Sequence, residues 1–313
     1  MDFLPIFARM VELFIIIIIG YVATKIKVIN RDIKAGLTKI ILYISIPCTI
    51  LSSVANAEKL PEGKELLILL AVSFSSYIVL FVLAKITGIL LGLSGKQKGA
   101  AEFGIMFANV GFIGFPVTEA IFGPDALIYT AMFNLPFNLL CYCLGVIMIK
   151  GEKLSKFGEN SSANELLKLI FTPAMISSIM ALIMTLLKTQ VPDLISNTLE
   201  RVGGITTPGA LIIIGASLAE IKVSEMFNNS KAYLFAVMSV IVTPLITYLI
   251  YKPFTADYPV LFGVTVIISA MPVATAGTML CVEHGGDERF MAQITFLTTL
   301  LTVFSIPIVA TRL

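Results

Sequence analysis

Apolar stretches of roughly 20 residues, the length that a helix needs to cross a bilayer, follow one another along almost the whole chain. Short polar gaps separate them. Because the bilayer core offers no water to the backbone, such stretches must be helical. The pattern predicts an all-α membrane protein with ten transmembrane helices, at 8–25, 36–55, 65–92, 99–121, 125–149, 165–187, 198–220, 232–251, 258–282 and 288–310.

Two of these stretches contain helix-breaking residues near their middle. Each interruption combines glycine and proline with small or polar residues, and the two lie in opposite halves of the chain. Paired breaks of this kind are typical of the binding site of a secondary transporter. The candidate substrate-binding residues are Asn109, Val110, Gly111 and Pro116 in the fourth stretch, and Pro272, Thr275, Ala276 and Gly277 in the ninth.

The two halves of the chain are expected to form an inverted repeat. Each half holds five predicted helices, and because five is odd, the halves enter the membrane from opposite sides. Pro47 and Pro208 occupy matching positions, and Asp125 and Asp287 are each expected to cap the next helix. The expected units are residues 1–150, a linker at 151–164, and residues 165–313.

Charge is scarce and unevenly placed. Only 13% of the residues are charged and the mean hydropathy is +0.95, whereas a soluble domain carries about 25% charge. Most of the 22 Lys and Arg residues fall in the gaps on one side of the predicted membrane. By the positive-inside rule that side is cytoplasmic. We therefore expect a multi-pass protein of the cytoplasmic membrane, with both termini outside and the 151–164 linker inside.

The breaks predict chemistry as well as topology. A helix interrupted within the membrane exposes N–H groups at the start of its second part, and these attract an anion. Glycines at Gly111 and Gly277 allow a substrate to approach the backbone closely. Asn109 could hold a carboxylate, or it could hydrogen-bond the broken helix to itself. The predicted cargo is thus a small organic anion.

Other polar positions have two interpretations each. Asn134 and Asn138 share one helix face and could contact substrate or bond to neighbouring helices. Ser52 is a further candidate for substrate binding, with packing as its alternative. Glu12 is read as a structural acid facing the bundle, or as a proton relay. His284 is read as a solvated residue at a helix end, or as a pH sensor.

Several function classes are disfavoured. The four cysteines fall inside the predicted helices, and their spacing fits neither a disulfide framework nor a zinc site. One histidine cannot assemble a catalytic constellation, and no phosphate-binding Gly-Lys loop is present. We expect no enzymatic activity, no cofactor, no bound metal and, without a basic patch, no nucleic-acid partner.

The ten stretches and the two interrupted motifs resemble the auxin efflux carrier family, which includes plant PIN auxin transporters and bacterial permeases for malate or malonate. The resemblance implies a fold like that of bile-acid sodium symporters and sodium–proton antiporters, with helices 4 and 9 crossing. It implies a dimeric scaffold of helices 1, 2, 6 and 7, and a moving, elevator-like unit of helices 3–5 and 8–10. It also places Asn109 at the substrate carboxylate and Thr275, Ala276 and Gly277 in the same pocket.

The sequence therefore predicts a homodimeric secondary transporter that moves a small organic carboxylate by alternating access. The alternative is a sodium- or proton-coupled ion exchanger of the same fold. Such exchangers carry buried carboxylates, and the scarcity of acids at mid-membrane depth disfavours this alternative. The acid carried, the coupling ion and the direction of transport stay open.

Overall fold

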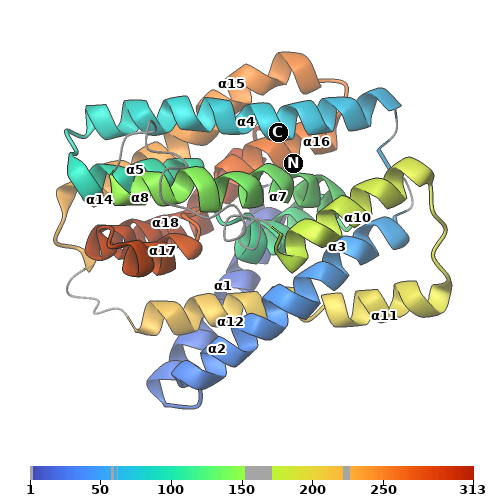
Figure 1. The fold of residues 1–313 in the computed structure, drawn as a ribbon, viewed down its shortest axis with the longest axis horizontal. Coiled ribbons are helices and arrows are strands. Elements are labelled where there is room, and N and C mark those ends of the chain that lie inside the picture. Colours follow the sequence, from blue (N-terminus) through green and yellow to red (C-terminus); the bar gives the residue numbers. More distant parts are fainter. Residues whose placement is uncertain (1–2, 58–59, 62, 152–170, 221–225) are drawn as a thin grey trace.

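A computed structural model describes residues 3–57, 60–61, 63–151, 171–220 and 226–313. Within these residues the protein is all-helical, and its only β-type pairing is one isolated bridge. Figure 1 shows the helices arranged as a bundle, with α4 and α15 on one side and α2, α12 and α11 on the other. The predicted linker at 151–164 and the start of the sixth predicted helix lie outside the described residues, apart from Gly151.

Helices occupy each of the predicted stretches. In the first half they are α1 (Phe3–Lys25), α2 (Arg31–Ile40), α3 (Ile46–Ala55), α4 (Gly63–Leu90), α5 (Gly95–Met106), α6 (Phe115–Phe122), α7 (Ala126–Leu140) and α8 (Val146–Lys150). In the second half they are α10 (Pro173–Leu187), α11 (Asp193–Gly203), α12 (Thr206–Ala219), α14 (Ser230–Val237), α15 (Thr243–Thr255), α16 (Pro259–Ser269), α17 (Ala276–His284) and α18 (Glu288–Ala310).

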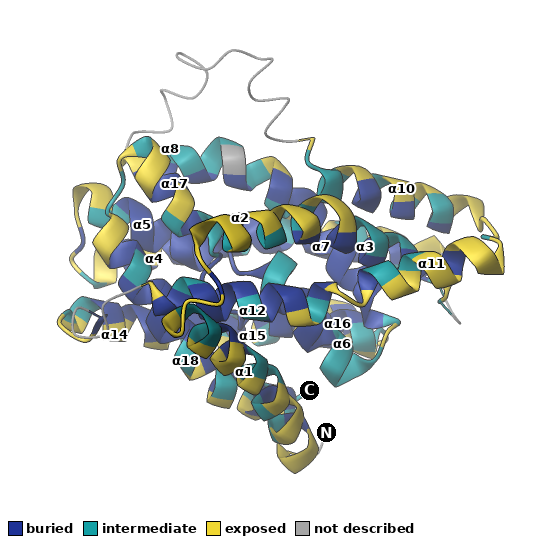
Figure 2. Ribbon diagram, turned by 90° about the horizontal axis from the view of Figure 1, so that it is seen from below, coloured by how far each residue is buried: buried dark blue, intermediate teal, exposed yellow. Residues whose placement is uncertain are grey.

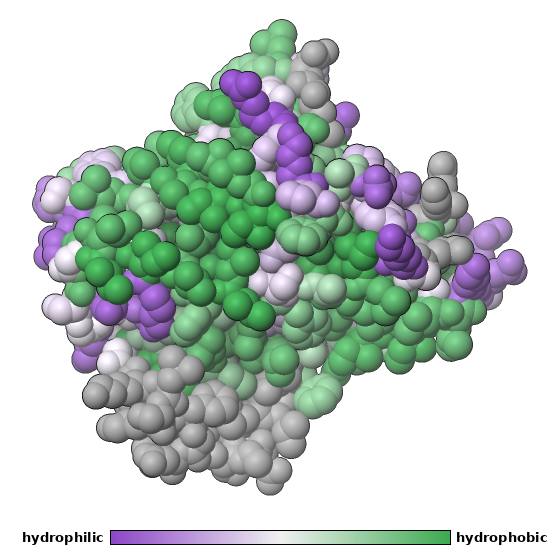
Figure 3. All heavy atoms as spheres, turned by 90° about the horizontal axis from the view of Figure 1, so that it is seen from above, coloured by the Kyte–Doolittle hydropathy of each residue, from purple (hydrophilic) through white to green (hydrophobic). Residues whose placement is uncertain are grey.

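Six spans in the described residues are long and apolar enough to cross a membrane. They are Phe3–Lys25, Arg31–Ala55, Gly63–Leu90, Asp193–Ala219, Ser230–Thr255 and Glu288–Ala310. A seventh, Ala126–Leu140 with Cys143–Lys150, is bent by 48°. Figure 3 shows apolar side chains spread over wide areas of one face, with hydrophilic side chains gathered in groups. These features are those of a multi-pass membrane protein.

Both predicted interruptions are present. In the first half, α5 ends at Met106 and α6 begins at Phe115, with an unwound segment and the π-helical turn Val110–Gly114 between them. In the second half, six residues separate the end of α16 from Ala276, where α17 begins. Neither stretch runs through the bundle as one continuous helix.

Three prolines follow π-helical turns at the same distance. The turns Ile41–Ser45, Val110–Gly114 and Met238–Val242 each end two residues before a proline: Pro47, Pro116 and Pro244. A proline ring clashes with the carbonyl four residues earlier and donates no N–H. A widened turn relieves that clash. The sequence therefore encodes local widening of these helices.

The two aspartates expected to cap helices behave differently. The Asp287 side chain accepts a hydrogen bond from the Phe290 N–H at 2.9 Å, which confirms that cap. The Asp125 side chain makes no such bond, so the second predicted cap is wrong. Asp125 itself has helical backbone angles, whereas a capping residue needs an extended backbone to turn its side chain back to the N–H groups.

Glycines bring α1 and α12 into direct backbone contact. A Cβ atom at Gly20 would overlap the carbonyl oxygen of Ile212, and one at Gly215 would overlap that of Ile17. Small residues at the interfaces of membrane helices permit this close approach, and van der Waals packing then stabilises the pair. The face of α1 turned away from α12 carries many exposed residues (Figure 2).

Candidate functional site

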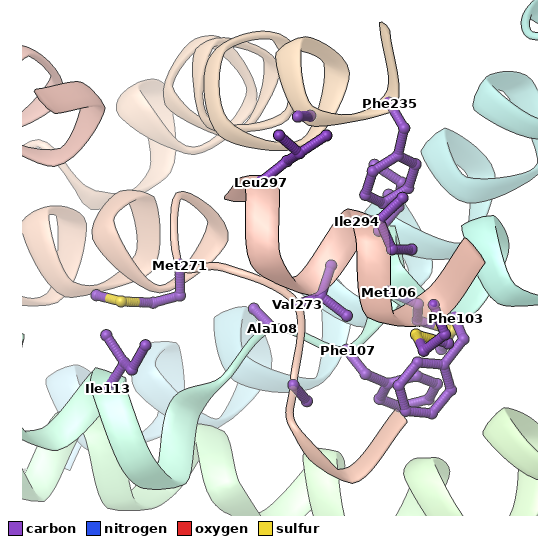
Figure 4. Close-up of a cluster of buried hydrophobic side chains, with 14 of the residues drawn as sticks. Phe103, Met106, Phe107, Ala108, Ile113, Phe235, Met271, Val273, Ile294 and Leu297 are labelled. Atoms are coloured by element: carbon purple, nitrogen blue, oxygen red, sulfur yellow. The ribbon is translucent and has the colours of Figure 1, made fainter. Parts of the chain in front are cut away.

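The two interruptions meet each other through their backbones. The N–H of Asn109 donates to the carbonyl oxygen of Pro272 at 2.8 Å, and the N–H of Ala274 donates to that of Phe107 at 3.0 Å. These bonds flank an antiparallel bridge between Ala108 and Val273. Figure 4 shows these two residues side by side where the unwound segments pass each other. Segments about half the chain apart thus satisfy each other's backbone groups, which an apolar interior requires.

A third bond fixes the second interruption to α18. The N–H of Val273 donates to the Thr298 hydroxyl oxygen at 3.2 Å, and that hydroxyl donates to the carbonyl of Ile294 at 2.7 Å. Thr298 was not a candidate in the sequence analysis. No local signal marks it, since threonines that bond to their own helix are common in apolar helices.

Asn109 uses one end of its side chain and leaves the other free. Its Oδ1 accepts a hydrogen bond from the Phe112 N–H at 3.1 Å and so caps the turn after the break. Its Nδ2 is buried and has no hydrogen-bond partner among the described residues. The oxygen therefore has the expected structural role, a hydrogen bond within the broken helix. The amide N–H group stays available to a ligand.

Asn134 and Asn138 differ in the same way. The Asn138 amide donates to the carbonyl of Asn134 at 2.9 Å, and its Oδ1 accepts from the Thr172 hydroxyl, the capping residue of α10, at 3.3 Å. The Nδ2 of Asn134 is buried and has no partner in the described part of the chain. Asn138 thus connects two helices, whereas Asn134 offers an unused donor.

The remaining candidates at the breaks differ in accessibility. Val110, Pro116 and Pro272 are buried, while Thr275 and Ala276 are half-buried at the start of α17. Val110 follows Asn109 in the first bonded segment, and the carbonyl of Pro272 accepts the Asn109 hydrogen bond in the second.

The two glycines are not equivalent. Nothing lies within 4 Å of the position that a Cβ would take at Gly111. At Gly277 the same position lies 2.7 Å from a ring carbon of Phe103 and 2.8 Å from the sulfur of Met291. In this conformation Gly111 therefore borders open space, whereas Gly277 allows close helix packing.

The void beside the meeting point is too small for an organic acid. A cavity of about 10 Å³ touches Ala108 and Ser269, with Tyr77 and Phe133 among its other walls. A volume of about 10–15 Å³ on this measure admits one water molecule. The site at the breaks is therefore closed in this conformation.

A much larger cavity lies between α3, α11, α12 and the corner that joins α6 to α7. Its volume is about 720 Å³, and its walls include Ser52, Thr49, Glu119 and Arg201. Ser52 is thus apart from the residues at the breaks. Its hydroxyl donates to the carbonyl of Thr49 at 3.0 Å, at the wall of this cavity.

Glu102 forms a buried ion pair that the sequence analysis did not identify. Its side chain is 5% exposed and contacts Lys85 of α4, and the Lys98 Nζ lies 3.9 Å from its Oε1. A signal was available in the chain: Lys85 lies five residues before the end of α4, and Glu102 lies seven residues after the start of α5. Antiparallel helices place such positions side by side.

We expect Lys85→Met to lower the free energy of unfolding by about 2 kcal/mol, because it leaves Glu102 buried with a weaker partner. Removal of one member of a fully buried pair costs about 3–5 kcal/mol, and the effect here is smaller since the lysine side chain is 36% exposed. Glu102→Gln should cost less, because the lysine left behind reaches solvent. Thermal unfolding of the purified variants measures both.

The control for this pair is Lys34→Met, which breaks the more exposed Lys34–Glu220 pair. Exposed pairs contribute at most about 1 kcal/mol, so its unfolding should stay close to that of the unchanged protein. Equal losses from Lys85→Met and Lys34→Met would contradict a buried role for Glu102.

Glu12 and His284, for which the sequence allowed two roles each, lie away from the breaks. Glu12 is exposed on α1, so the expectation that it faces the bundle is wrong. Glu12 lies on the face of α1 that is turned away from α12. His284 is the half-buried last residue of α17. The described residues contain no group of His, Cys, Asp or Glu suited to a metal ion.

Comparison with known proteins finds transporters along nearly the whole chain. A family model described as membrane transport protein matches residues 5–310. An uncharacterised transporter of Methanothermobacter thermautotrophicus is 23% identical over 311 residues, which cover 94% of each chain. An uncharacterised transporter of Methanocaldococcus jannaschii is 23% identical over 308 residues, covering 95% of this chain and 94% of the relative.

Proposed function

Because the chain belongs to the membrane transport protein family, the auxin efflux carrier family that its motifs resemble, we propose that it is a secondary transporter for a small organic carboxylate. The observation that carries the substrate class is a pair of buried amide donors, the Nδ2 atoms of Asn109 and Asn134, that find no acceptor within the described part of the chain. A buried donor left unpaired costs about 1–3 kcal/mol. A carboxylate, which only accepts hydrogen bonds, relieves that cost.

The proposed topology is the ten-helix inverted repeat. In it the fourth helix comprises α5 and α6, the ninth comprises α16 and α17, and the two cross at their interruptions. The hydrogen bonds between Asn109 and Pro272 and between Phe107 and Ala274 support this crossing. Both termini then lie outside the cytoplasmic membrane. Two copies associate through a scaffold made of the first, second, sixth and seventh predicted membrane helices.

The unequal cavities support alternating access. The large cavity opens at the ends of α3 and α6, which the proposed topology places outside, while the void at the breaks is closed. Transport then requires the unit formed by the predicted membrane helices 3–5 and 8–10 to move against the scaffold. This movement exposes the amides of Asn109 and Asn134 to each side of the membrane in turn.

The test is uptake of radiolabelled carboxylates by liposomes that contain the purified protein. At least one small organic acid should show saturable uptake that unlabelled acid inhibits. Empty liposomes provide the control for diffusion of the neutral form. Movement of sodium or protons that needs no organic acid, with no acid carried, would favour the ion exchanger and contradict this proposal.

The two asparagines of α7 should separate function from stability. Asn134→Leu removes the unused donor, so we expect uptake of the carried acid to fall about tenfold or more, the effect of losing one hydrogen bond to a charged group. Asn138→Leu removes the bond to Thr172. It should lower the unfolding temperature more than Asn134→Leu does and lower uptake less. The reverse pattern in uptake and thermal unfolding would assign the substrate contact to Asn138.

A further inference from the structure

The large cavity contains charges of both signs, and this bears on the cargo. Building on the proposed carboxylate transport, we infer that the substrate also carries an ammonium group, so that it is an amino acid or a similar zwitterion. The inference concerns the cavity of about 720 Å³ between α3, α11, α12 and the α6–α7 corner. It is the one cavity among those described above that is large enough to hold such a molecule.

The walls of this cavity carry one cation and three carboxylates: Arg201, Glu119, Asp125 and Glu200. Glu200 accepts a hydrogen bond from the Asn56 amide at 3.0 Å. The Glu119 carboxylate is half-buried and has no hydrogen-bond or ion-pair partner among the described residues. A carboxylate partly withdrawn from water without a donor is best stabilised by an external cation.

The balance of charge disfavours a simple acid. A dicarboxylate that enters this cavity meets one guanidinium and three negative charges, and cavities with low-dielectric walls strengthen such fields. A zwitterion instead places its carboxylate at Arg201, whose planar guanidinium suits that group. Its ammonium then faces Glu119 and Asp125. The same cavity thus favours molecules that carry both groups.

One helix connects the cavity wall to an amide of the proposed site. Leu127 of α7 lines the cavity, and Asn134 follows seven residues later on the same helix face. Buried apolar side chains, with Val110, Phe115 and Ala131 among them, fill the space near this face. We assign the cavity as the outer binding position, closed off by this apolar cluster from the inner position at Asn109 and Asn134.

The experiment compares acids that differ only in an α-amino group. Liposomes containing the full-length protein receive labelled propionate or alanine, succinate or aspartate, and 3-phenylpropionate or phenylalanine. In the pair that is carried best, we expect kcat/KM of the amino member to be about tenfold higher, as one favourable charge contact gives. Uptake of the members without an amino group alone would overturn the inference and leave the proposed function intact. Uptake of none would overturn both.

Two variants test the assigned contacts. Glu119→Gln should raise KM about tenfold for the amino member and leave its partner acid nearly unchanged, since only the ammonium faces Glu119. Arg201→Gln should raise KM for both members, because both carry the carboxylate. The matched control is Asp193→Asn, which removes a carboxylate from α11 outside the cavity and should change neither. Equal effects of Glu119→Gln on both members would contradict the inference.

Discussion

Asn109→Ala should lower kcat/KM for uptake of the transported acid about 100-fold. The substitution removes the buried Nδ2 donor that we assign to the substrate carboxylate. A hydrogen bond to a charged group contributes about 1.5–3 kcal/mol, and about 2.8 kcal/mol corresponds to a factor of 100. Initial rates of uptake into proteoliposomes over a range of acid concentrations measure the effect.

A second variant separates binding from folding. Asn109→Ala also removes the Oδ1 that accepts from the Phe112 N–H, so it weakens the cap of the turn. Asn109→Ser keeps a hydroxyl oxygen that can cap this N–H, but its O–H lies one bond nearer the backbone than the amide donor and so falls short of the substrate. We expect Asn109→Ser to fold nearly as well as the unchanged protein and to lose transport as Asn109→Ala does. Full uptake by Asn109→Ser would show that the amide does not contact the substrate.

Gly215→Ala should lower the free energy of unfolding by about 3 kcal/mol, the upper end of the usual cost of overpacking. The added Cβ would overlap the Ile17 carbonyl oxygen and approach the Tyr21 nitrogen to 2.7 Å, and both are backbone atoms. Backbone cannot rotate away as a side chain can, so α1 and α12 must separate. The yield of folded protein and its thermal unfolding in detergent measure the effect.

The matched control is Gly36→Ala, which adds the same methyl group to α2 where nothing lies within 4 Å. Alanine forms helices better than glycine by about 1 kcal/mol, so this variant should be as stable as the unchanged protein, or slightly more so. A similar loss of stability in both variants would show that the contact of α1 with α12 does not limit the fold.

Much of the fold follows from the sequence because membranes impose simple rules. Apolar length sets where helices lie, and Gly111 with Pro116, or Pro272 with Gly277, marks where they stop. The predicted interruptions are confirmed within one or two turns. The sequence could not show that Asn109 binds the backbone of Pro272, because nothing local specifies which distant segment satisfies an unwound backbone.

The roles of single polar residues were harder to predict. Asn134 and Asn138 share a helix face and a residue type, so only the partner Thr172 distinguishes them. Periodicity likewise fails for Glu12, because a helix that is apolar on all sides gives no indication of which face is turned to the bundle. Glu102 required knowledge of the partner helix that supplies Lys85.

The most direct test of the proposed site is a structure of the protein with its best-bound carboxylate. We expect a carboxylate oxygen about 2.9 Å from the Nδ2 of Asn109, the length of an ordinary N–H···O hydrogen bond, with the acid lying between the two interrupted helices. A bound acid remote from both interruptions, with the Asn109 amide still unpaired, would contradict the assignment.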